Sequence, residues 1–516
     1  MKPVSQIKKE NGVSTLYVDN APFIALGGQL HNSSSSSAEW LDKKVWPFLK
    51  PVNLNSVIAT VSWEQIEPSQ GVFDFSVLDH LIASAQENGV KLTLIWFGLW
   101  KNGQSTFVPE WVKLDRQKYW VCQCPDTSRL SSYYHEMPAK TISPFCKAAV
   151  EADATAFSAL MRHLKQVDKL GTVILIQVEN EIGLLGAVRD FSPPATELFN
   201  SAIPTQLADA IGKNGSWAEV FGRNASESFM AWNYGIAVEK IASAGKGQYN
   251  LPMYVNAWLE QYPDCAGVYP SGGPVAKMMD IWKVAAPSID FYAPDIYVPD
   301  FEKVIAEYSK NENPLFIPET ASSVDSAARV FLALCEYNAI GFNPFGIEDL
   351  FGKGRGISEE ELAALNINSS AFCNEGTAAF LPASYKLLSS IMHLILPARG
   401  TGRLRGFYNG GLDNGTVLEF SQYEAQVIFQ KPESGKPKAG GGILEVGPNE
   451  FYVFGTNFKV LFAPGREECC HSHYLRIEEG IFENGEWKRG RILNGDEQRV
   501  EIPFEPTILR VKLYKY

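Results

Sequence analysis

The chain has 516 residues, 45% of them hydrophobic and 20% charged, and its formal net charge is −12. This length allows two or three domains, or one large barrel with an appended domain, and a core of that size needs neither disulfides nor metals for stability. The excess of acidic residues argues against nucleic acid and anionic membranes as partners, because both recruit basic surfaces.

The N-terminal part of the chain predicts a β-hairpin followed by a barrel. Ser14–Val18 alternates and Val18–Pro22 has turn chemistry. Apolar segments of strand length then alternate with helical periodicity, as in Phe75–Asn88 and Ala149–Lys169. The eight segments are Phe23–Leu26, Ser56–Val61, Lys91–Phe97, Val173–Val178, Met253–Asn256, Ile289–Ala293, Leu315–Pro318 and Ala339–Asn343. This rhythm predicts a parallel sheet closed into a (β/α)8 TIM barrel. A doubly wound sheet is less favoured, because no G-x-G-x-x-G motif follows a strand.

The pattern changes near residue 395. Pro382–Ile395 predicts a last helix that begins at Pro382 and is ended by Pro397 and Gly400. From Gly406 onward alternation and turns predict a β-sandwich, and residues 432–442 predict an exposed loop. The predicted strands are Val417–Phe420, Ala425–Phe429, Ile443–Val446, Phe451–Phe454, Lys459–Phe462 and Leu509–Leu513. We therefore expect a barrel with its hairpin over residues 1–395 and a β-sandwich over residues 396–516.

Polar side chains close two of the apolar segments. Gln177 lies near the end of the fourth segment, Glu179, Asn180 and Glu181 follow it, and Glu319 closes the seventh. In a (β/α)8 barrel the carboxyl ends of the strands form the catalytic face. Retaining glycoside hydrolysis needs two carboxyls there, about 5–5.5 Å apart, one to protonate the leaving oxygen and one to attack the anomeric carbon. The pair therefore predicts a glycosidase that needs no cofactor.

These motifs resemble those of the retaining glycosidases called clan A, with Asn-Glu after strand 4 and Glu on strand 7. Within that clan, residues 1–395 resemble glycoside hydrolase family 35, the β-galactosidases, in its compact bacterial branch with a single β domain. The resemblance implies Glu181 as general acid/base, Glu319 as nucleophile and Asn180 as the residue that holds the sugar 2-hydroxyl. It is carried by the segments Gly27–His31, Glu39–Trp40, Leu54–Val57, Trp63–Phe75, Pro109–Trp111 and Gln177–Gly183.

Two departures from the family pattern affect sugar contacts. Asn32 and five serines stand where the family has Tyr, and Leu99-Trp100 replaces its Glu-Trp after strand 3. The resemblance still implies exo-hydrolysis of terminal β-D-galactosyl residues from oligo- or polysaccharides. A β-glucosidase, a transglycosylase and a non-catalytic carbohydrate-binding barrel remain alternatives.

Other strand ends supply candidate substrate contacts, each of which could equally be a core or structural residue. Trp96 and Trp100 flank the third strand, and we expect one of them to stack on a sugar. Of the tyrosines near the sixth strand, we expect Tyr297 rather than Tyr292 to hydrogen-bond Glu319 and keep it ionised. The remaining candidates are His31, Trp63 and Trp258.

The cysteines do not predict a metal centre or a disulfide scaffold. There are eight in the chain, and Cys469-Cys470-His471-Ser472-His473 lacks a second ligand pair for a tetrahedral site. We expect free thiols, no metal and a carbohydrate substrate as partner, with a homo-oligomer left open. No apolar leader follows Met1 and no apolar run of about 18 residues occurs, so we expect a cytoplasmic location without membrane spans.

Overall fold

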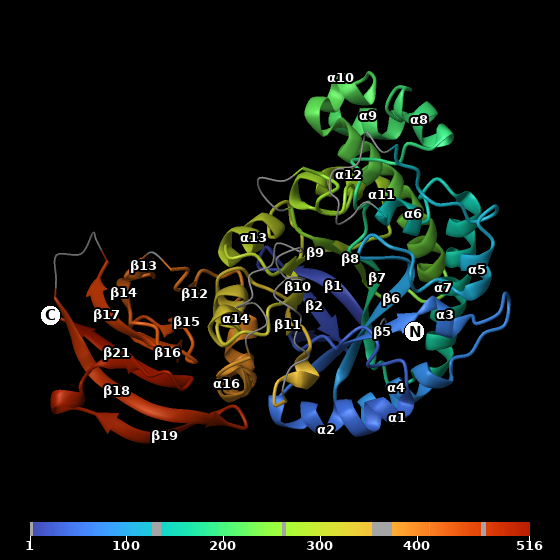
Figure 1. Ribbon diagram of the computed structural model, residues 1–516. Coiled ribbons are helices and arrows are strands. Elements are labelled where there is room, and N and C mark those ends of the chain that lie inside the picture. The colour runs from blue at the N-terminus through green and yellow to red at the C-terminus, as the bar shows by residue number, and fades with distance from the viewer. Residues whose placement is uncertain (1–3, 126–135, 261–264, 353–373, 412, 466–470) are drawn as a thin grey trace.

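The computed structural model describes residues 4–125, 136–260, 265–352, 374–411, 413–465 and 471–516. A barrel of strands and helices is followed in the chain by a body of antiparallel strands, which lies at one side of the barrel (Figure 1). The predicted fold class, a (β/α)8 TIM barrel followed by a C-terminal β-sandwich, is confirmed.

The barrel sheet has eight parallel strands whose spatial order follows the chain. Its strands are β4 (Ala25–Leu26), β5 (Ser56–Ser62), β6 (Lys91–Lys101), β7 (Val173–Asn180), β8 (Met253–Trp258), β9 (Phe291–Ile296), β10 (Phe316–Thr320) and β11 (Gly341–Pro344). β11 pairs with β4. The N–H of Ile58 in β5 then donates to the carbonyl of Gly28 (2.9 Å), and the N–H of Leu30 donates to that of Ile58 (2.9 Å). The cylinder is therefore closed.

Helices cover the outside of this sheet. The longer ones are α4 (Ser76–Glu87), α7 (Lys147–Val167), α11 (Ala225–Lys246), α12 (Met279–Ala285), α13 (Phe301–Tyr308), α14 (Ser326–Cys335) and α16 (Thr377–Ala398). Shorter helical segments are α1 (Ala38–Trp40), α2 (Trp46–Leu49), α3 (Trp63–Ile66), α5 (Glu110–Leu114), α6 (Met137–Lys140), α8 (Pro193–Phe199), α9 (Thr205–Ile211) and α10 (Trp217–Phe221). In α7 the face formed by Phe157, Leu160 and Leu164 is buried, as its periodicity predicts.

The last helix of the barrel begins at Thr377, not at Pro382 as predicted. Pro382 lies inside α16, where burial of Leu381, Tyr385 and Leu388 offsets the lost backbone hydrogen bond. The Tyr385 hydroxyl donates to the carbonyl of Gly27 at 2.8 Å, which fastens the helix to the barrel. Within the described part of the chain, α16 alone is long and apolar enough to cross a membrane. Its buried face explains that composition.

The N-terminal hairpin closes one end of the barrel. Its strands β1 (Ser5–Glu10), β2 (Val13–Val18) and β3 (Ala21–Phe23) form an antiparallel sheet. Leu16 and Val18 join the buried cluster inside the barrel. The guanidinium of Arg399, just after α16, donates to the carbonyls of Ser14 (2.8 Å), Asn338 (2.7 Å) and Ala339 (2.9 Å). The hairpin, the eighth strand and the end of the barrel are thus tied together.

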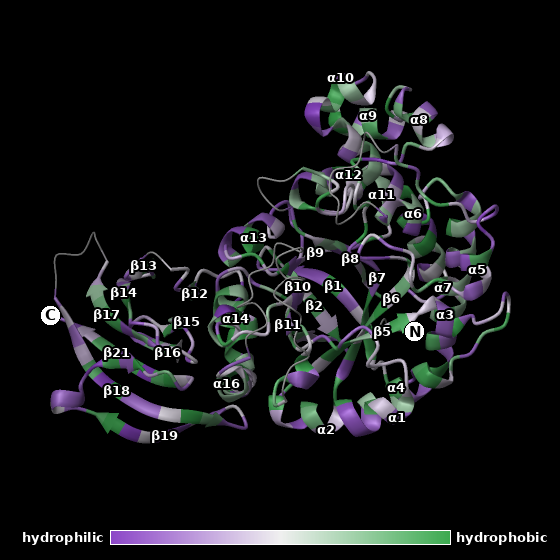
Figure 2. Ribbon diagram, viewed as in Figure 1, coloured by the Kyte–Doolittle hydropathy of each residue, from purple (hydrophilic) through white to green (hydrophobic). Residues whose placement is uncertain are grey.

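The C-terminal domain consists of two antiparallel sheets, in the orders β12-β15-β16-β21-β18-β19 and β13-β14-β17-β20. Its strands are β12 (Leu404–Tyr408), β13 (Gly415–Glu419), β14 (Tyr423–Phe429), β15 (Gly440–Gly447), β16 (Glu450–Thr456), β17 (Phe458–Pro464), β18 (Ser472–Glu483), β19 (Glu486–Leu493), β20 (Val500–Ile502) and β21 (Thr507–Lys515). The six predicted strands are present, whereas β12, β18, β19 and β20 were not predicted. β18 and β19 carry exposed hydrophilic residues over much of their length and lack clean alternation (Figure 2).

The predicted loop over residues 432–442 is partly wrong, because Gly440–Gly442 begin β15. These glycines are buried against α14: a Cβ at Gly440 would lie 2.8 Å from the Cβ of Ala328. α14 lies between the barrel and the C-terminal domain (Figure 1). Close backbone packing, rather than turn flexibility, therefore explains the glycines at the end of this run.

Candidate active site

Three carboxyl groups converge at the carboxyl ends of β7, β9 and β10. Glu181 directly follows β7, Asp295 lies in β9 and Glu319 lies in β10, where it is the register partner of Asp295. Their side chains are nearly buried, with 7%, 3% and 7% exposure for Glu181, Asp295 and Glu319. Asp295 also hydrogen-bonds Glu181. The strands of the barrel thus bring together the two carboxyls expected from the sequence and add a third.

Glu319 is held by one hydrogen bond on each carboxyl oxygen. The Tyr297 hydroxyl donates to Oε1 at 2.5 Å, and Nε2 of Gln29 donates to Oε2 at 2.7 Å. The hydroxyl of Tyr292, in contrast, has no partner among the described residues. Donors on both oxygens stabilise the ionised carboxylate and fix its orientation. Gln29 belongs to the loop after β4 and was not singled out in the sequence.

Glu181 is in an environment that favours its protonated form. Burial, reinforced by the negative charge of Glu319, raises its pKa to about 7, although Lys101 and the hydrogen bond from Asp295 act in the opposite direction. Burial, followed by the charges of Glu319 and Glu181, raises the pKa of Asp295 well above its usual value. Neighbouring carboxyls with different proton affinities are the arrangement on which acid/base pairs depend.

The backbone around Glu181 is strained and held from the neighbouring strand. Glu179 and Glu181 have φ angles of +62° and +46°, which side chains rarely adopt. The N–H of Glu181 donates to Oδ1 of Asn256 in β8 at 2.9 Å, and Nδ2 of Asn256 donates to Asp295 at 2.5 Å. Asn256 therefore couples the orientation of Glu181 to that of Asp295.

Asn180 has a fully buried side chain, and neither its amide nitrogen nor its amide oxygen has a hydrogen-bond partner among the described residues. A buried polar group without a partner costs about 1–3 kcal/mol. The Asn180 amide, directly before Glu181 in the chain, thus has hydrogen-bonding capacity that no described residue uses.

Glu179 does not face this cluster, which corrects the expectation that it borders a cleft. Its Oε2 accepts a hydrogen bond from the N–H of Trp100 (2.7 Å) and its Oε1 one from Leu99 (3.1 Å). These donors lie where β6 bulges relative to β7. Asp153 of α7 hydrogen-bonds Glu179 and accepts from the indole of Trp96 at 2.7 Å. Burial raises the pKa of Asp153 to about 6 and that of Glu179 well above its usual value.

The predicted tryptophan contacts at strand ends are wrong for Trp63 and Trp100, and Trp96 is likewise excluded. All three side chains have no exposed surface. The indole of Trp63 donates to Glu67 at 2.8 Å, and that of Trp100 to the carbonyl of Ile142 at 2.9 Å. These rings point outward between strands and helices, so none can stack on a sugar. Trp258, at the end of β8, is partly exposed and stays a candidate.

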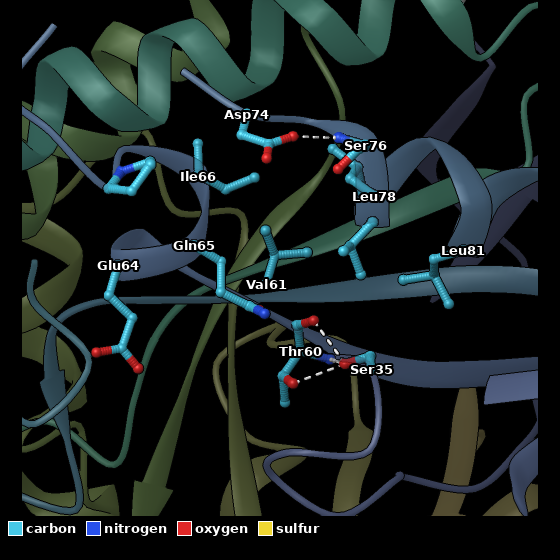
Figure 3. Close-up of a pocket in the computed structure, with 12 residues that line it drawn as sticks. Ser35, Thr60, Val61, Glu64, Gln65, Ile66, Asp74, Ser76, Leu78 and Leu81 are labelled. Carbon is cyan, nitrogen blue, oxygen red and sulfur yellow. Dashed lines mark hydrogen bonds between the residues drawn. The ribbon is translucent and has the colours of Figure 1, made fainter. Parts of the chain in front are cut away.

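His31 and the serine run lie on the loop after β4. His31 Nε2 is 2.8 Å from Oδ2 of Asp349, and the hydroxyl of Ser34 donates to Glu348 at 2.7 Å. The hydroxyl of Ser35 is bonded to Thr60 beside a cavity of about 220 Å³, which is also lined by apolar side chains of α4 (Figure 3). The serine run is thus fastened to β5 and to the loop after β11. His31 is partly exposed and remains a candidate contact.

No cluster of three or more His, Cys, Asp and Glu side chains that could hold a metal ion occurs in the described ranges. Cys469 and Cys470 lie outside the described residues. Cys122, Cys124, Cys146, Cys265 and Cys335 are free thiols.

Comparisons with known proteins agree with this geometry. Residues 39–233 match the model of a glycoside hydrolase family, number 42, described as beta-galactosidase. Residues 381–505, which span α16 and most of the C-terminal domain, match a domain of unknown function, DUF5597.

Two human proteins match part of the chain. Beta-galactosidase-1-like protein 3 is 27% identical over 176 residues, or 33% of this chain and 23% of that protein. Beta-galactosidase-1-like protein 2 is 27% identical over 171 residues, or 32% and 23%. The match thus spans about a quarter of the length of these curated relatives. Among solved structures, a β-galactosidase from Bacillus circulans sp. alkalophilus has a TM-score of 0.47 at 11% identity, covering 72% of this chain and 57% of that one.

The matched segment contains β7 and Glu181 but ends before β9 and β10, so the relationship rests on the first half of the barrel. Glu319, in β10, lies outside the matched segment. Over residues 39–233 the barrel of this protein is similar to the glycoside hydrolase family described as beta-galactosidase.

Proposed function

We propose that this protein is a retaining exo-glycosidase that removes terminal β-D-galactosyl residues from oligo- or polysaccharides. The observation that carries the proposal is the contrast between two neighbouring carboxyls. Burial gives Glu181 a pKa of about 7, whereas Glu319 accepts hydrogen bonds on both oxygens. One group is suited to donate a proton near neutral pH, and the other to attack as a carboxylate.

The reaction proceeds in two displacements. Glu319 attacks the anomeric carbon while Glu181 gives its proton to the glycosidic oxygen, so the bond to the aglycone breaks and a glycosyl ester forms on Glu319. Glu181, now ionised, takes a proton from water, and the resulting hydroxide equivalent displaces Glu319 from the anomeric carbon. The sugar leaves with its β configuration retained. Asn180 holds the sugar 2-hydroxyl, for which its unpaired amide is suited.

Galactose as the sugar is supported by the match of residues 39–233 to a family described as beta-galactosidase. The sequence motifs after the first, second and fourth strands support membership of family 35 in particular. A β-glucosidase or a transglycosylase would use the same carboxyls, so substrate and product analysis must separate them.

A panel of nitrophenyl β-glycosides tests the proposal. We expect release of nitrophenol from the β-galactoside at least tenfold faster than from the β-glucoside. Proton NMR should show that galactose is first released as the β anomer. When sugar acceptors are added, most of the galactose should still be released by hydrolysis and not transferred to the acceptor. Glu319→Gln should abolish turnover. Glu64→Gln is the matched control. The Glu64 carboxylate lies outside the carboxyl cluster and pairs with the Lys113 ammonium at 3.0 Å. Near wild-type turnover by Glu319→Gln would refute the proposal.

A further inference from the structure

A cavity of about 380 Å³ lies between the barrel and the C-terminal domain. From the barrel it is lined by residues 297–299 after β9 and by residues 321 and 323–325 after β10. From the C-terminal domain it is lined by Gly410, Ser434, Gly435 and Lys438. We call it the interdomain cavity. Loops after β9 and β10 belong to the catalytic face, so this cavity opens on the same face as the carboxyl cluster.

Tyr297 connects the interdomain cavity to the cluster. It lines the cavity, and its hydroxyl donates to Glu319 at 2.5 Å. Ala321, another lining residue, follows Glu319 by two positions. A ligand that spans the cluster and the cavity therefore passes Tyr297 without leaving the protein surface.

The wall supplied by the C-terminal domain is held in place by the barrel. Asp325 accepts hydrogen bonds from the hydroxyl of Tyr408 (3.1 Å) and the backbone N–H of Lys438 (3.2 Å), and it pairs with the Lys438 ammonium at 3.4 Å. The guanidinium of Arg405 binds Glu336 through two hydrogen bonds of 3.0 and 2.9 Å. A wall fixed before binding loses little entropy when a ligand enters.

The chemistry of the cavity suits a neutral, hydroxyl-rich ligand. Its charged residues are two acids, Asp325 and Glu375, and two bases, Arg329 and Lys438, so no net charge favours an ion. The Arg329 guanidinium stacks on Phe301 (5.2 Å) and Tyr408 (5.6 Å), and its Nε has no acceptor among the described residues. The volume is within the roughly 300–1,000 Å³ of small-ligand pockets.

We propose that the interdomain cavity is a subsite for a neutral sugar residue of an oligosaccharide substrate, separate from the residue that is transferred, and that the C-terminal domain exists in part to build it. This inference rests on the proposed function. It assigns the domain of unknown function a direct role in choosing longer substrates.

The test compares a short and a long substrate on one set of variants. Ser434→Trp places an indole at the exposed rim of the cavity, and Lys438→Met removes a polar group from its wall. Leu475→Trp, at a position on β18 that is 64% exposed and outside the cavity lining, is the control. For nitrophenyl β-galactoside we expect kcat/KM within twofold of wild type in all three variants. For a neutral β-galacto-tetrasaccharide we expect Ser434→Trp to lower kcat/KM at least tenfold, chiefly through KM, and Lys438→Met to lower it severalfold.

Equal kcat/KM for the tetrasaccharide in Ser434→Trp and wild type would overturn the inference, as would an equal loss on both substrates. If wild type hydrolyses no glycoside, the proposed function fails, and calorimetric titration of the tetrasaccharide then decides whether the cavity binds sugar. Binding to wild type that Ser434→Trp weakens at least tenfold, and Leu475→Trp does not, would support the subsite. Absence of such a difference would overturn it.

Discussion

Removal of the Tyr297 hydroxyl tests how the proposed nucleophile, Glu319, is held in position. In Tyr297→Phe, Glu319 keeps the 2.7 Å hydrogen bond from Gln29 but loses the 2.5 Å bond on its other oxygen. A hydrogen bond to a charged group contributes about 1.5–3 kcal/mol, and about 1.4 kcal/mol corresponds to a tenfold change in rate. Because this bond orients the carboxylate for attack on the anomeric carbon, its loss should lower kcat/KM by about ten- to a hundredfold.

The assay measures kcat/KM for nitrophenyl β-galactoside across the pH range in which the folded protein is stable. Tyr292→Phe is the matched control, because Tyr292 lies on β9, which Tyr297 directly follows, and its hydroxyl has no hydrogen-bond partner among the described residues. Near wild-type kcat/KM in Tyr297→Phe would refute the reasoning. So would an equal loss of kcat/KM in Tyr292→Phe, since the effect would then come from loss of any nearby hydroxyl.

Three further predictions concern the same barrel and its junction. The alkaline limb of kcat/KM should lie near pH 7, and Glu181→Gln should remove it; a limb that persists in the variant would contradict the assignment of Glu181. Burial raises the pKa of Glu181 from 4.5 to about 7, so its contribution to stability is fully present below about pH 4.5 and is lost as the pH rises through 7. Chemical denaturation should therefore show the free energy of unfolding of Glu181→Gln rising relative to that of wild type by up to about 3 kcal/mol over this pH interval. Gly98→Ala should lower the free energy of unfolding, measured by chemical denaturation, by about 3 kcal/mol or more, because the added Cβ would lie 2.3 Å from a carboxyl oxygen of Asp153. In the control Gly410→Ala the added Cβ would have no atom within 4 Å, so the loss should be less than about 1 kcal/mol.

The sequence predicts the barrel well because its strands are buried on both faces. Val173–Ile176 is an unbroken apolar run for that reason, and the polar residues from Gln177 onward mark the end of β7. The same logic fails for β18 and β19, in which most residues are exposed or half-buried and the few buried ones, such as Ile477 and Glu478, do not alternate with exposed ones. Elements with a buried face are predictable, and elements held mainly by backbone pairing to a neighbour are not.

The site is predictable only in part for a related reason. Motif spacing locates Glu181 and Glu319, but the depth and direction of a side chain depend on partners that are distant in sequence. Trp100 lies near the end of β6, whereas Trp96 lies in its middle, and their indoles donate to the carbonyl of Ile142 and to Asp153 of α7, respectively, and not to a substrate. Asp295 and Gln29 gain their roles from register and from loop geometry, which single residues do not reveal.

The hydrogen bonds of the Arg399 guanidinium connect the first and the last segments of the barrel sequence. Burial lowers the pKa of this guanidinium to about 10, so it depends on its three carbonyl acceptors, one of which is that of Ser14 in the hairpin. Removal of the hairpin would take away the Ser14 carbonyl and leave the buried Arg399 guanidinium with one hydrogen-bond acceptor fewer. Arg399 lies at the point where the chain enters the C-terminal domain. We therefore expect removal of the hairpin to loosen the junction between the barrel and the C-terminal domain, although the two are far apart in sequence.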